Sequence, residues 1–269
     1  MPSPDPDKVA AAIRETAEIE VMPLFGKLAA GDIREKGPGD LVSIADEAAE
    51  RHLTERLQAL LPGSVVVGEE AVAADLSVLD RLAVSGDIWI IDPIDGTLNF
   101  CAAIPIFAVM VALVRRGETV GSWIYHPVSR EMFSAMRGEG AWLDGARLQV
   151  ADAGPLDAMN GAFSPGFVPD EARRAELRRH YLFHGDPGDF RCAGREYSEL
   201  SRGRRHFTTY NGLKPWDHAP GILLHSEAGG YSATMDDGMP YSLQRHKGPL
   251  LAAPDRDSWQ ALRALIYDN

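Results

Sequence analysis

The stretch WIIDPIDGTLNF, residues 89–100, carries the strongest structural signal in the chain. Its apolar beginning predicts a buried strand over residues 87–91, with Asp92 at the carboxyl end of that strand. Pro93 follows directly, and because proline has no N–H group to donate, we expect the strand pairing to end there.

A turn and a helix start follow this predicted strand. Asp95 lies on the turn, and Gly96-Thr97 open a helical segment. The free N–H groups and the positive dipole end of such a segment suit a bound phosphate. Helix capping is the simpler explanation for Asp95 and Thr97, but capping gives no reason for the additional acid at Asp92.

Two more acids stand at the end of another predicted strand. Residues 64–68 form a short apolar run, and Glu69-Glu70 follow it directly. Ligand sites in sheets of this kind usually lie beyond the carboxyl ends of the strands. Acids at the ends of two strands, Glu69 and Asp92 among them, therefore favour a metal site over capping alone.

The composition is that of an ordinary globular protein. Of 269 residues, 45% are apolar and 25% charged, and 39 acids against 27 Lys and Arg give a net charge of −12. This charge disfavours nucleic acid and anionic membranes as partners, and no apolar run approaches the roughly 18 residues of a membrane helix. The N-terminus predicts no signal peptide, and two cysteines are too few for a disulfide framework. We expect a cytoplasmic location.

Hydropathy and turn signals predict two halves, residues 1–150 and 151–269, with a seam near 151–156. In the first half we expect helical turns over 8–30 with a bend at Pro23, a loop at 36–40, a helix over 44–60 and an antiparallel meander over 106–148. In the second half we expect strands over 160–163 and 250–253 and helices over 169–180, 195–202, 216–227 and 257–267. This alternation indicates an α/β or α+β fold with covered sheets.

One phosphatase class with a similar motif can be excluded. Haloacid-dehalogenase phosphatases use Asp-x-Asp-Gly-Thr, and the first Asp is their nucleophile. Aligning Asp95-Gly96-Thr97 with that pattern puts Pro93 at the nucleophile position. Proline has no group that attacks phosphorus, so a phosphoaspartyl mechanism is excluded.

The spacing instead resembles that of the inositol monophosphatase family, whose signature is an apolar strand followed by Asp-Pro-x-Asp-Gly-Thr-x-Asn-Phe. Other motifs of the family occur in order along nearly the whole chain: KGPGDLVSIAD at 36–46, VGEE at 67–70, WLDG at 142–145, PWDHA at 215–219 and EAGG at 227–230. The resemblance implies a layered αβαβα sandwich of the inositol monophosphatase and fructose-1,6-bisphosphatase type. It also implies Mg²⁺-dependent phosphomonoester hydrolysis and usually a homodimer.

The same resemblance implies a metal centre. Glu69, Asp92 and the backbone carbonyl of Ile94 match the ligands of a first metal, and Asp92, Asp95 and Asp217 match those of a second. Family members often hold a third ion beside Glu69, so we expect two or three Mg²⁺ ions. Such cations are needed because each close pair of like charges at 4 Å costs about 4 kcal/mol at an effective dielectric near 20. Oxygen ligands select hard ions such as Mg²⁺.

Further matched positions have catalytic or phosphate-binding roles in the family. Asp46 matches a residue that supports Thr97, and this pair is implied to orient the attacking water, with Glu69 as the third catalytic residue. Amide groups near Gly96 and Thr97, next to Asp95, match the phosphate cradle.

Several of these residues also have a simpler structural explanation. Asp217 would cap the helix that begins nearby, and Asp46 would be a favourable acid in a first helical turn. Lys36 lies in a loop that is mobile in the family, and its simplest explanation is a solvated surface charge. His218 is expected to pack in the interior, Glu70 to lie outside the primary ligands, and both cysteines to be inert buried thiols.

The substrate-selecting segment departs from the inositol-specific pattern. Inositol-specific members have Gly-Ser-Ala-Ala where residues 194–197 read GREY, and they have an acid that contacts inositol hydroxyls where this chain has Tyr210. The predicted substrate-binding residues are therefore Arg191, Arg195, Glu196, Tyr197 and Tyr210. The arginines at 173–179 are most simply a solvated helix face, whereas Arg191 and Arg195 flank the place where family members bind the organic part of the substrate. Nucleic-acid binding through the arginines of 173–205 is a poorer alternative.

These observations predict a Mg²⁺-dependent phosphomonoesterase that hydrolyses a small phosphorylated metabolite, inositol- or sugar-phosphate-like, by metal-activated water. Alternatives in the same class are histidinol-phosphate phosphatase, fructose-1,6-bisphosphatase and adenosine 3′,5′-bisphosphate phosphatase. The GREY run and the GLKP run at 212–215 look closer to members that act on histidinol phosphate or other small phosphates. A non-catalytic phosphate-ligand-binding protein is the alternative from another class.

Overall fold

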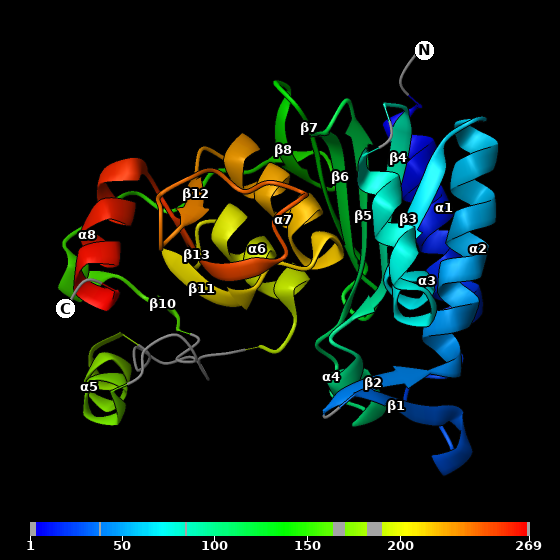
Figure 1. Cartoon of the computed structure of the whole chain (residues 1–269), viewed down its shortest axis with the longest axis horizontal. Coiled ribbons are helices and arrows are strands. Elements are labelled where there is room, and N and C mark those ends of the chain that lie inside the picture. Colours follow the sequence, from blue (N-terminus) through cyan, green and yellow to red (C-terminus); the bar gives the residue numbers. More distant parts are fainter. Residues whose placement is uncertain (1–3, 38, 84, 164–169, 182–189, 268–269) are drawn as a thin grey trace.

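The fold consists of five layers in the order αβαβα, which follow one another from right to left in Figure 1. The computed structural model describes residues 4–37, 39–83, 85–163, 170–181 and 190–267. Within this part of the chain, the two larger of three sheets alternate with three helical layers. The layered αβαβα sandwich predicted from the sequence is confirmed.

A seven-stranded sheet forms the second layer, in the order β3-β4-β5-β6-β7-β8-β9. Its strands are β3 (Val65–Gly68), β4 (Asp87–Asp95), β5 (Ala108–Arg115), β6 (Glu118–His126), β7 (Glu131–Met136), β8 (Gly140–Leu143) and β9 (Ala146–Arg147). β3 and β4 are parallel, and every other neighbouring pair is antiparallel. The predicted strands at 64–68 and 87–91 and the predicted meander are thereby confirmed.

Two helices, α1 (Pro6–Thr16) and α2 (Ile44–Leu60), cover one face of this sheet. Val9 and Ile13 of α1, and Leu53 and Leu57 of α2, are spaced four residues apart and therefore lie on one side of each helix. All four are buried against the sheet, where they join a core cluster that includes Trp89. Helix α2 matches the helix predicted over 44–60.

Helices α6 (Ala193–Ser201) and α7 (Pro215–Glu227) cover the opposite face and form the middle layer. Tyr197 of α6 and Leu223 of α7 pack with Met110 and Ile124 of the sheet. Nearer the start of α7, Trp216 joins a second cluster on the same face. This packing brings the N-terminal end of α7 to the sheet.

A four-stranded sheet and two helices complete the layers. The sheet has the order β10-β11-β13-β12 and consists of β10 (Gly161–Ala162), β11 (Phe207–Gly212), β13 (Lys247–Ala253) and β12 (Tyr231–Thr234). Helix α8 (Arg256–Ile266) packs on its outer face through Trp259 and Leu262, and α5 (Glu171–Tyr181) lies on the same side of the molecule (Figure 1). The sequence did not predict β11 or β12.

Smaller elements surround the edge of the large sheet. They are a hairpin of β1 (Ile33–Gly37) and β2 (Asp40–Ser43), the short helices α3 (Glu69–Ala74) and α4 (Thr97–Cys101), a π-helical turn η1 (Ala17–Val21), and 3₁₀ turns η2 (Ala30–Asp32), η3 (Leu76–Ala83) and η4 (Leu156–Ala158). The hairpin, α3 and α4 lie close to the carboxyl ends of β3 and β4.

Three local predictions were wrong. The helical turns expected over 8–30 stop at Val21, where η1 follows α1 directly, and only turns come after; Pro23 has no N–H to continue a helical ladder. The loop expected at 36–40 is too long, because Lys36 and Gly37 belong to β1 and Asp40 belongs to β2 of a hairpin; Pro38 lies outside the described residues. Strand β4 does not end at Pro93 but continues to Asp95 through an irregularity.

The division into residues 1–150 and 151–269 stays a prediction. Helices α6 and α7, which follow the predicted seam, pack directly on a sheet whose last strand ends at Arg147. Among the described residues, none of the helices combines the length and the apolar character needed to cross a bilayer.

Candidate active site

Three carboxylates meet where β4 ends and α7 begins. Asp92, Asp95 and Asp217 each offer an oxygen atom, and these oxygens lie within 4.8 Å of one another. Asp92 and Asp95 come from β4, and Asp217 is the third residue of α7. The packing of α7 on the sheet therefore brings together acids that are far apart in the sequence.

A bulge in β4 allows Asp92 and Asp95 to face the same side. Asp92 pairs with Met110 and Asp95 with Ala108, so two residues of β4 stand opposite one residue of β5. Residues three apart in a regular strand face opposite sides of the sheet, and one extra residue reverses this alternation. Pro93 lies in the bulge, where no ladder hydrogen bond is required of it.

The Asp95 carboxylate is held by the start of α6. The Cys192 thiol donates to Oδ2 at 3.0 Å, the Ala193 N–H donates to Oδ1 at 3.1 Å, and the Gly194 N–H donates to Oδ2 at 2.6 Å. Burial raises the pKa of Asp95 to about 6, although these three donors act in the opposite direction. A Cβ at Gly194 would lie 3.1 Å from Asp95 Oδ2, so glycine permits this close approach.

The cluster carries more negative charge than its surroundings neutralise. Burial, followed by repulsion from Glu69 and other acids, raises the pKa of Asp92 and of Asp217 well above the usual range. Buried carboxylates without enough counter-charge either take up protons or bind a cation. The donors are all oxygen atoms, as Mg²⁺, Ca²⁺ and Mn²⁺ require. The residues present therefore fit a hard divalent cation.

Glu69 lines the same cavity as these acids and is contacted by lysines. Lys36 Nζ lies 3.1 Å from Glu69 Oε1 and 2.9 Å from Glu70 Oε1, and Lys214 Nζ lies 3.7 Å from Glu69 Oε1. Burial lowers the pKa of Lys36, but Glu69 and Glu70 outweigh it and raise that pKa overall. The Lys36 side chain is only 14% exposed, so its interpretation as a solvated surface charge was wrong.

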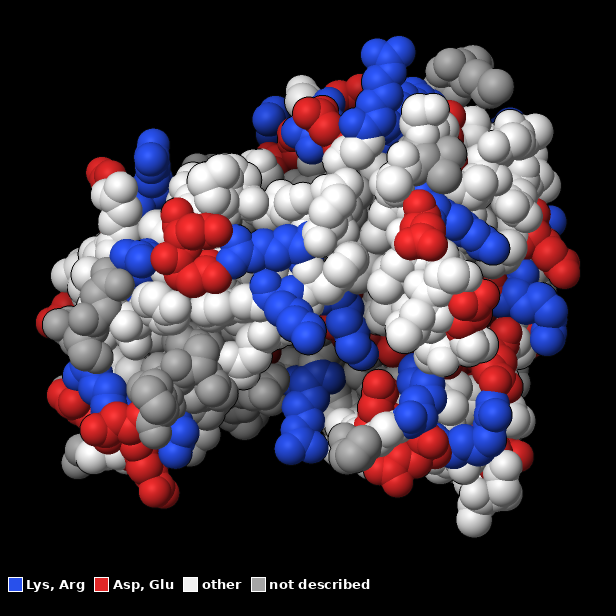
Figure 2. Space-filling view, viewed as in Figure 1, with Lys and Arg blue, Asp and Glu red and all other residues white. Residues whose placement is uncertain are grey.

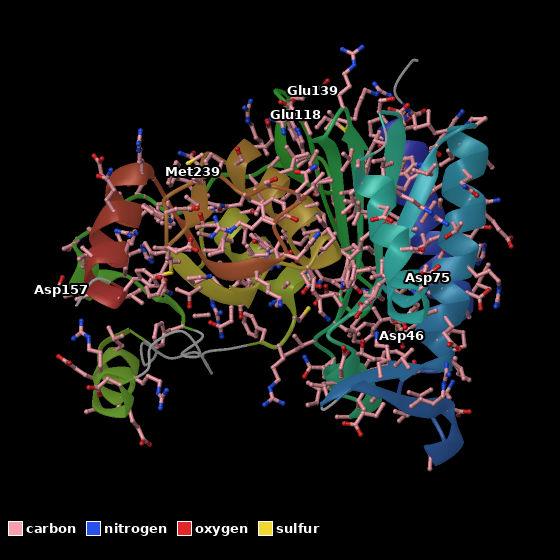
Figure 3. The ribbon with its side chains drawn as sticks, in the orientation of Figure 1. Asp46, Asp75, Glu118, Glu139, Asp157 and Met239 are labelled. Carbon is pink, nitrogen blue, oxygen red and sulfur yellow. The ribbon has the colours of Figure 1, made fainter. Side chains whose placement is uncertain are left out.

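Asp46 joins the start of α2 to Thr97 at the start of α4. Its Oδ2 accepts from the Ser43 N–H at 2.8 Å and from the Ser43 hydroxyl at 2.6 Å, as a capping acid would. Its Oδ1 lies 3.1 Å from Thr97 Oγ1, which is also 2.9 Å from the carbonyl oxygen of Ile94. Burial raises the pKa of Asp46 to about 6. Figure 3 shows Asp46 at the end of α2 nearest the hairpin.

Gly96 allows the backbone between β4 and α4 to pack closely against Ile106 and Cys192. It has φ +88° and precedes α4, and a Cβ there would lie 3.0 Å from the Ile106 carbonyl oxygen and 3.2 Å from Cys192 Cβ. Both the positive φ and the close approach require glycine. The N–H groups of the first turn of α4 consequently border the same cavity as the acids.

Two cavities adjoin at this point. The smaller, about 160 Å³, is lined by Glu69 and the three aspartates, and the larger, about 310 Å³, lies between α6, β11 and α7. The two share Asp95, Arg191, Lys214 and Asp217 in their linings. Figure 2 shows Lys and Arg side chains gathered beside the notch in the lower middle of the molecule. The arrangement suits cations at the acids, an anionic group held by those cations, and a second chemical group in the larger cavity.

Only some of the predicted substrate-binding residues line these cavities. Arg191 lines both, and Tyr210 and Glu196 line the larger one. The Glu196 carboxylate is already paired, since Arg205 Nη1 lies 2.5 Å from Oε2 and the Thr208 hydroxyl donates to the same oxygen at 3.2 Å. Glu196 therefore presents little free negative charge to the larger cavity.

Arg195 and Tyr197 line neither cavity. The guanidinium of Arg195 pairs at 3.0 Å with Glu199, whose side chain is buried one turn further along α6. Tyr197 is fully buried, and its ring stacks on Tyr210 at 5.1 Å between centroids. A helix turns about 100° per residue, so adjacent residues cannot all face one cavity.

His218 has the packing role predicted for it. Its Nε2 donates to the Gly212 carbonyl oxygen at 2.7 Å, so its Nδ1 accepts the hydrogen bond of the Tyr197 hydroxyl at 2.9 Å. Burial lowers its pKa to about 4, which keeps the ring neutral. Cys192 is buried as predicted, whereas Cys101 is only partly buried. Burial and Asp95 raise the pKa of Cys192 well above the usual range.

The arginine-rich stretch is occupied largely by internal ion pairs. Arg173 pairs with Glu176, Arg202 with Glu131, and Arg205 with Glu196. The side chains of residues 178–181 lie outside the described part of the chain. The described arginines therefore contact mainly acids of the fold itself. Arg173, which was expected on a solvated helix face, is 20% exposed and also donates to the Leu265 carbonyl oxygen.

Two residues of the site were missed by the sequence reasoning. Lys214 precedes Asp217 by three residues and lines both cavities. Glu50 lies one helical turn after Asp46 and contacts the backbone of α3. The four-residue spacing of Asp46 and Glu50 on one helix is the signal that places the second acid near the first.

Known proteins are similar to this chain over most of its length. The pattern of the Inositol monophosphatase family matches residues 6–267. An inositol-1-monophosphatase of Rhizobium meliloti (strain 1021) is 35% identical over 218 residues, which are 80% of this chain and 79% of that protein. The Nus factor SuhB of Escherichia coli (strain K12) is 33% identical over 213 residues, which are 78% of this chain and 77% of that protein.

A solved structure shares the five-layered fold. The IMPase of Thermotoga maritima superimposes with a TM-score of 0.81 and covers 97% of this chain and 96% of its own, at 22% identity. The family pattern spans nearly all residues, and the acids of its signature meet in one cavity here. This chain therefore belongs to the inositol monophosphatase family, and it is a metal-dependent phosphatase.

Proposed function

We propose that this phosphatase uses Mg²⁺ to hydrolyse a small phosphomonoester by direct attack of water, without a covalent enzyme intermediate. The approach of Asp92, Asp95 and Asp217 to within 4.8 Å is the observation that supports it most. Glu69 and the Ile94 backbone line the same cavity. These five residues would hold two or three ions.

Bound Mg²⁺ would supply charge neutralisation and polarisation of the phosphate oxygens. The residues themselves set where those ions and the ester lie. Asp95 is fixed by the backbone of α6, and Asp92 is fixed by its place in β4. Electrostatic groups that are already in position need no reorganisation during the reaction.

Thr97 and Asp46 would hold the attacking water. The Thr97 hydroxyl has one proton and two acceptors beside it, Asp46 Oδ1 and the Ile94 carbonyl oxygen. When the hydroxyl donates that proton to one of these acceptors, the lone pairs of Thr97 Oγ1 remain available to accept a hydrogen bond from water. The N–H groups near Gly96 and Thr97 would bind the phosphate oxygens at the start of α4.

The larger cavity would receive the organic part of the substrate. Its border carries the cations Arg191 and Lys214, and its wall includes the rings of Phe163 and Tyr210. The one acid of its α6 wall, Glu196, is neutralised by Arg205. Hydroxyl-rich inositol would find no free acid on that wall, which supports a different small phosphate ester as substrate.

The experiment is a phosphate-release assay with purified protein and Mg²⁺ over a panel of esters. The panel contains inositol 1-phosphate, histidinol phosphate, fructose 1,6-bisphosphate and adenosine 3′,5′-bisphosphate. We expect Mg²⁺-dependent release from at least one of them, abolished by chelation, and weak release from inositol 1-phosphate. Tight binding of these esters without any release would contradict the proposal and favour a phosphate-ligand-binding protein.

The expected homodimer and cytoplasmic location stay predictions. Light scattering of the purified protein at several concentrations tests the first, and a mass of one chain at all concentrations would contradict it.

A further inference from the structure

Helix α3 carries Glu69 and Glu70 but has no cap of its own. Its N-cap residue is Gly68, which has no side chain. Glu50 of α2 takes over this function, because its Oε2 accepts the Glu70 N–H at 2.7 Å and its Oε1 accepts the Ala71 N–H at 2.8 Å. A helix start leaves such N–H groups without intrahelical partners, so one carboxylate here satisfies two of them.

Gly68 and Glu50 fit together closely. Glu50 is 7% exposed, and a Cβ on Gly68 would lie 2.2 Å from Glu50 Cδ and 2.4–2.5 Å from its two oxygens. No heavy atoms approach to that distance without a bond, so only glycine leaves room for the carboxylate. The Glu50 carboxylate is therefore confined between α2 and the turn that joins β3 to α3.

Helix α2 thus contacts the site through two acids one turn apart. Asp46 contacts Thr97 at the start of α4, and Glu50 contacts the start of α3. Each acid accepts a backbone N–H group that begins a helix, Ser43 for α2 and Glu70 for α3. The two short segments that border the acidic cavity are therefore both held by one long helix, α2, whose inner side packs on the large sheet.

We propose that Glu50 is a positioning residue of the metal centre, which fixes the first turn of α3 so that Glu69 faces Asp92 across the smaller cavity. Lys36 contacts the carboxylates of Glu69 and Glu70, while Glu50 holds the backbone of the same turn. The proposal rests on the proposed function only in requiring that the acidic cavity binds a divalent cation.

The first test is the isosteric variant Glu50→Gln. Glutamine keeps one acceptor oxygen but turns an NH₂ group toward the other N–H, so the turn loses part of its restraint. Mg²⁺ alone is titrated into each protein and its Kd is measured by calorimetry. We expect the Kd of Glu50→Gln to rise about tenfold or more, as for other residues that orient metal ligands. Glu55→Gln, an exposed acid of the same helix, is the matched control and keeps the wild-type Kd.

Gly68→Ala is an independent route to the same effect, because its Cβ displaces the Glu50 carboxylate. We expect a similar rise in the Kd for Mg²⁺. The double variant Glu50→Gln/Gly68→Ala should bind Mg²⁺ about as well as Gly68→Ala alone, because both changes remove the same contact between Glu50 and the first turn of α3. Raising the Mg²⁺ concentration should restore turnover in Glu50→Gln, with the KM for the ester unchanged.

A merely structural role gives a different result. Lower melting temperatures with an unchanged Kd for Mg²⁺ in both variants would overturn the proposal. Loss of the folded state in both variants would overturn it as well, because positioning requires folded proteins with weaker metal binding. A different result would refute the proposed function and leave this inference standing: the wild-type protein binds Mg²⁺ but hydrolyses no ester, and Glu50→Gln binds Mg²⁺ more weakly than wild type.

Discussion

The hydroxyl of Thr97 in α4 lies 3.1 Å from the carboxylate of Asp46 in α2, although the two residues are 51 positions apart in the sequence. The same hydroxyl lies 2.9 Å from the carbonyl oxygen of Ile94 in the β4 bulge. One side chain thus joins the start of the long helix α2, the end of a strand and the start of a short helix.

Removing this hydroxyl should slow the chemical step more than substrate binding. We expect Thr97→Val to lower kcat about 100-fold with little change in KM, the range found when a positioned proton-transfer partner is lost. Thr97→Ser keeps the hydroxyl and should retain most activity. Steady-state kinetics at saturating Mg²⁺ measures both, and equal kcat values for the two variants would exclude a role for the hydroxyl.

Asp92 should be the most sensitive acid of the site. Asp92→Asn removes a charge from the centre of the cluster, and we expect kcat to fall at least about 100-fold and Mg²⁺ binding to weaken. Asp157→Asn, an exposed acid on the far side of the molecule in Figure 3, is the control and should behave as wild type. Near-normal turnover of Asp92→Asn with saturating Mg²⁺ would show that the metal lies elsewhere.

The acidic cluster should make the response to Mg²⁺ depend on pH. Burial raises the pKa of Asp46 and of Asp95 to about 6 in the metal-free protein. The folded state then binds more protons than the unfolded chain, so the contribution of these groups to stability is present below about pH 4 and is lost as the pH rises through about 6.

Mg²⁺ displaces the proton of its ligand Asp95, so the stabilisation that Mg²⁺ gives should grow over the same pH interval. We expect the rise in melting temperature on adding Mg²⁺ to be larger at about pH 7 than at about pH 5. Thermal melts with Mg²⁺ and with chelator at both values measure it. An equal rise at the two values would mean that Asp95 does not bind the ion.

Two arginines close together in sequence should differ in their effect on substrate binding. Arg191 lines both cavities, whereas Arg195 pairs with Glu199 outside them. A hydrogen bond to a charged group contributes about 1.5–3 kcal/mol, so Arg191→Met should raise KM about tenfold or more. Arg195→Met should leave KM nearly unchanged. A larger rise in KM for Arg195→Met than for Arg191→Met would place the substrate beside Arg195, outside the two cavities.

Much of this site follows from sequence because its acids stand at the ends of predictable elements. Asp92 and Glu69 follow buried apolar strands, and parallel pairing of β3 and β4 brings those ends together. The bulge that turns Asp95 to the side of Asp92 did not follow, because Pro93 was taken to end the strand. A proline ends pairing only where a donor is needed, and a bulge removes that need.

The substrate side was harder to predict for a different reason. The residues at 194–197 were treated as one wall, but they lie on a helix whose rotation about its axis is set by packing. Burial of Tyr197 against Tyr210 turns Arg195 toward Glu199. Local sequence does not specify this rotation, because it depends on residues of β11 and α7.

Because the site combines residues of β4 and α7, hydrolysis requires these two parts of the chain to stay packed together. Asp92 and Asp95 belong to a sheet that ends at Arg147, and Asp217 belongs to a helix that begins at Pro215. Residues 152–155 between them are exposed. A protease cut there would leave every acid intact, yet turnover would persist only while the two fragments stayed associated, so the assay would report on their cohesion.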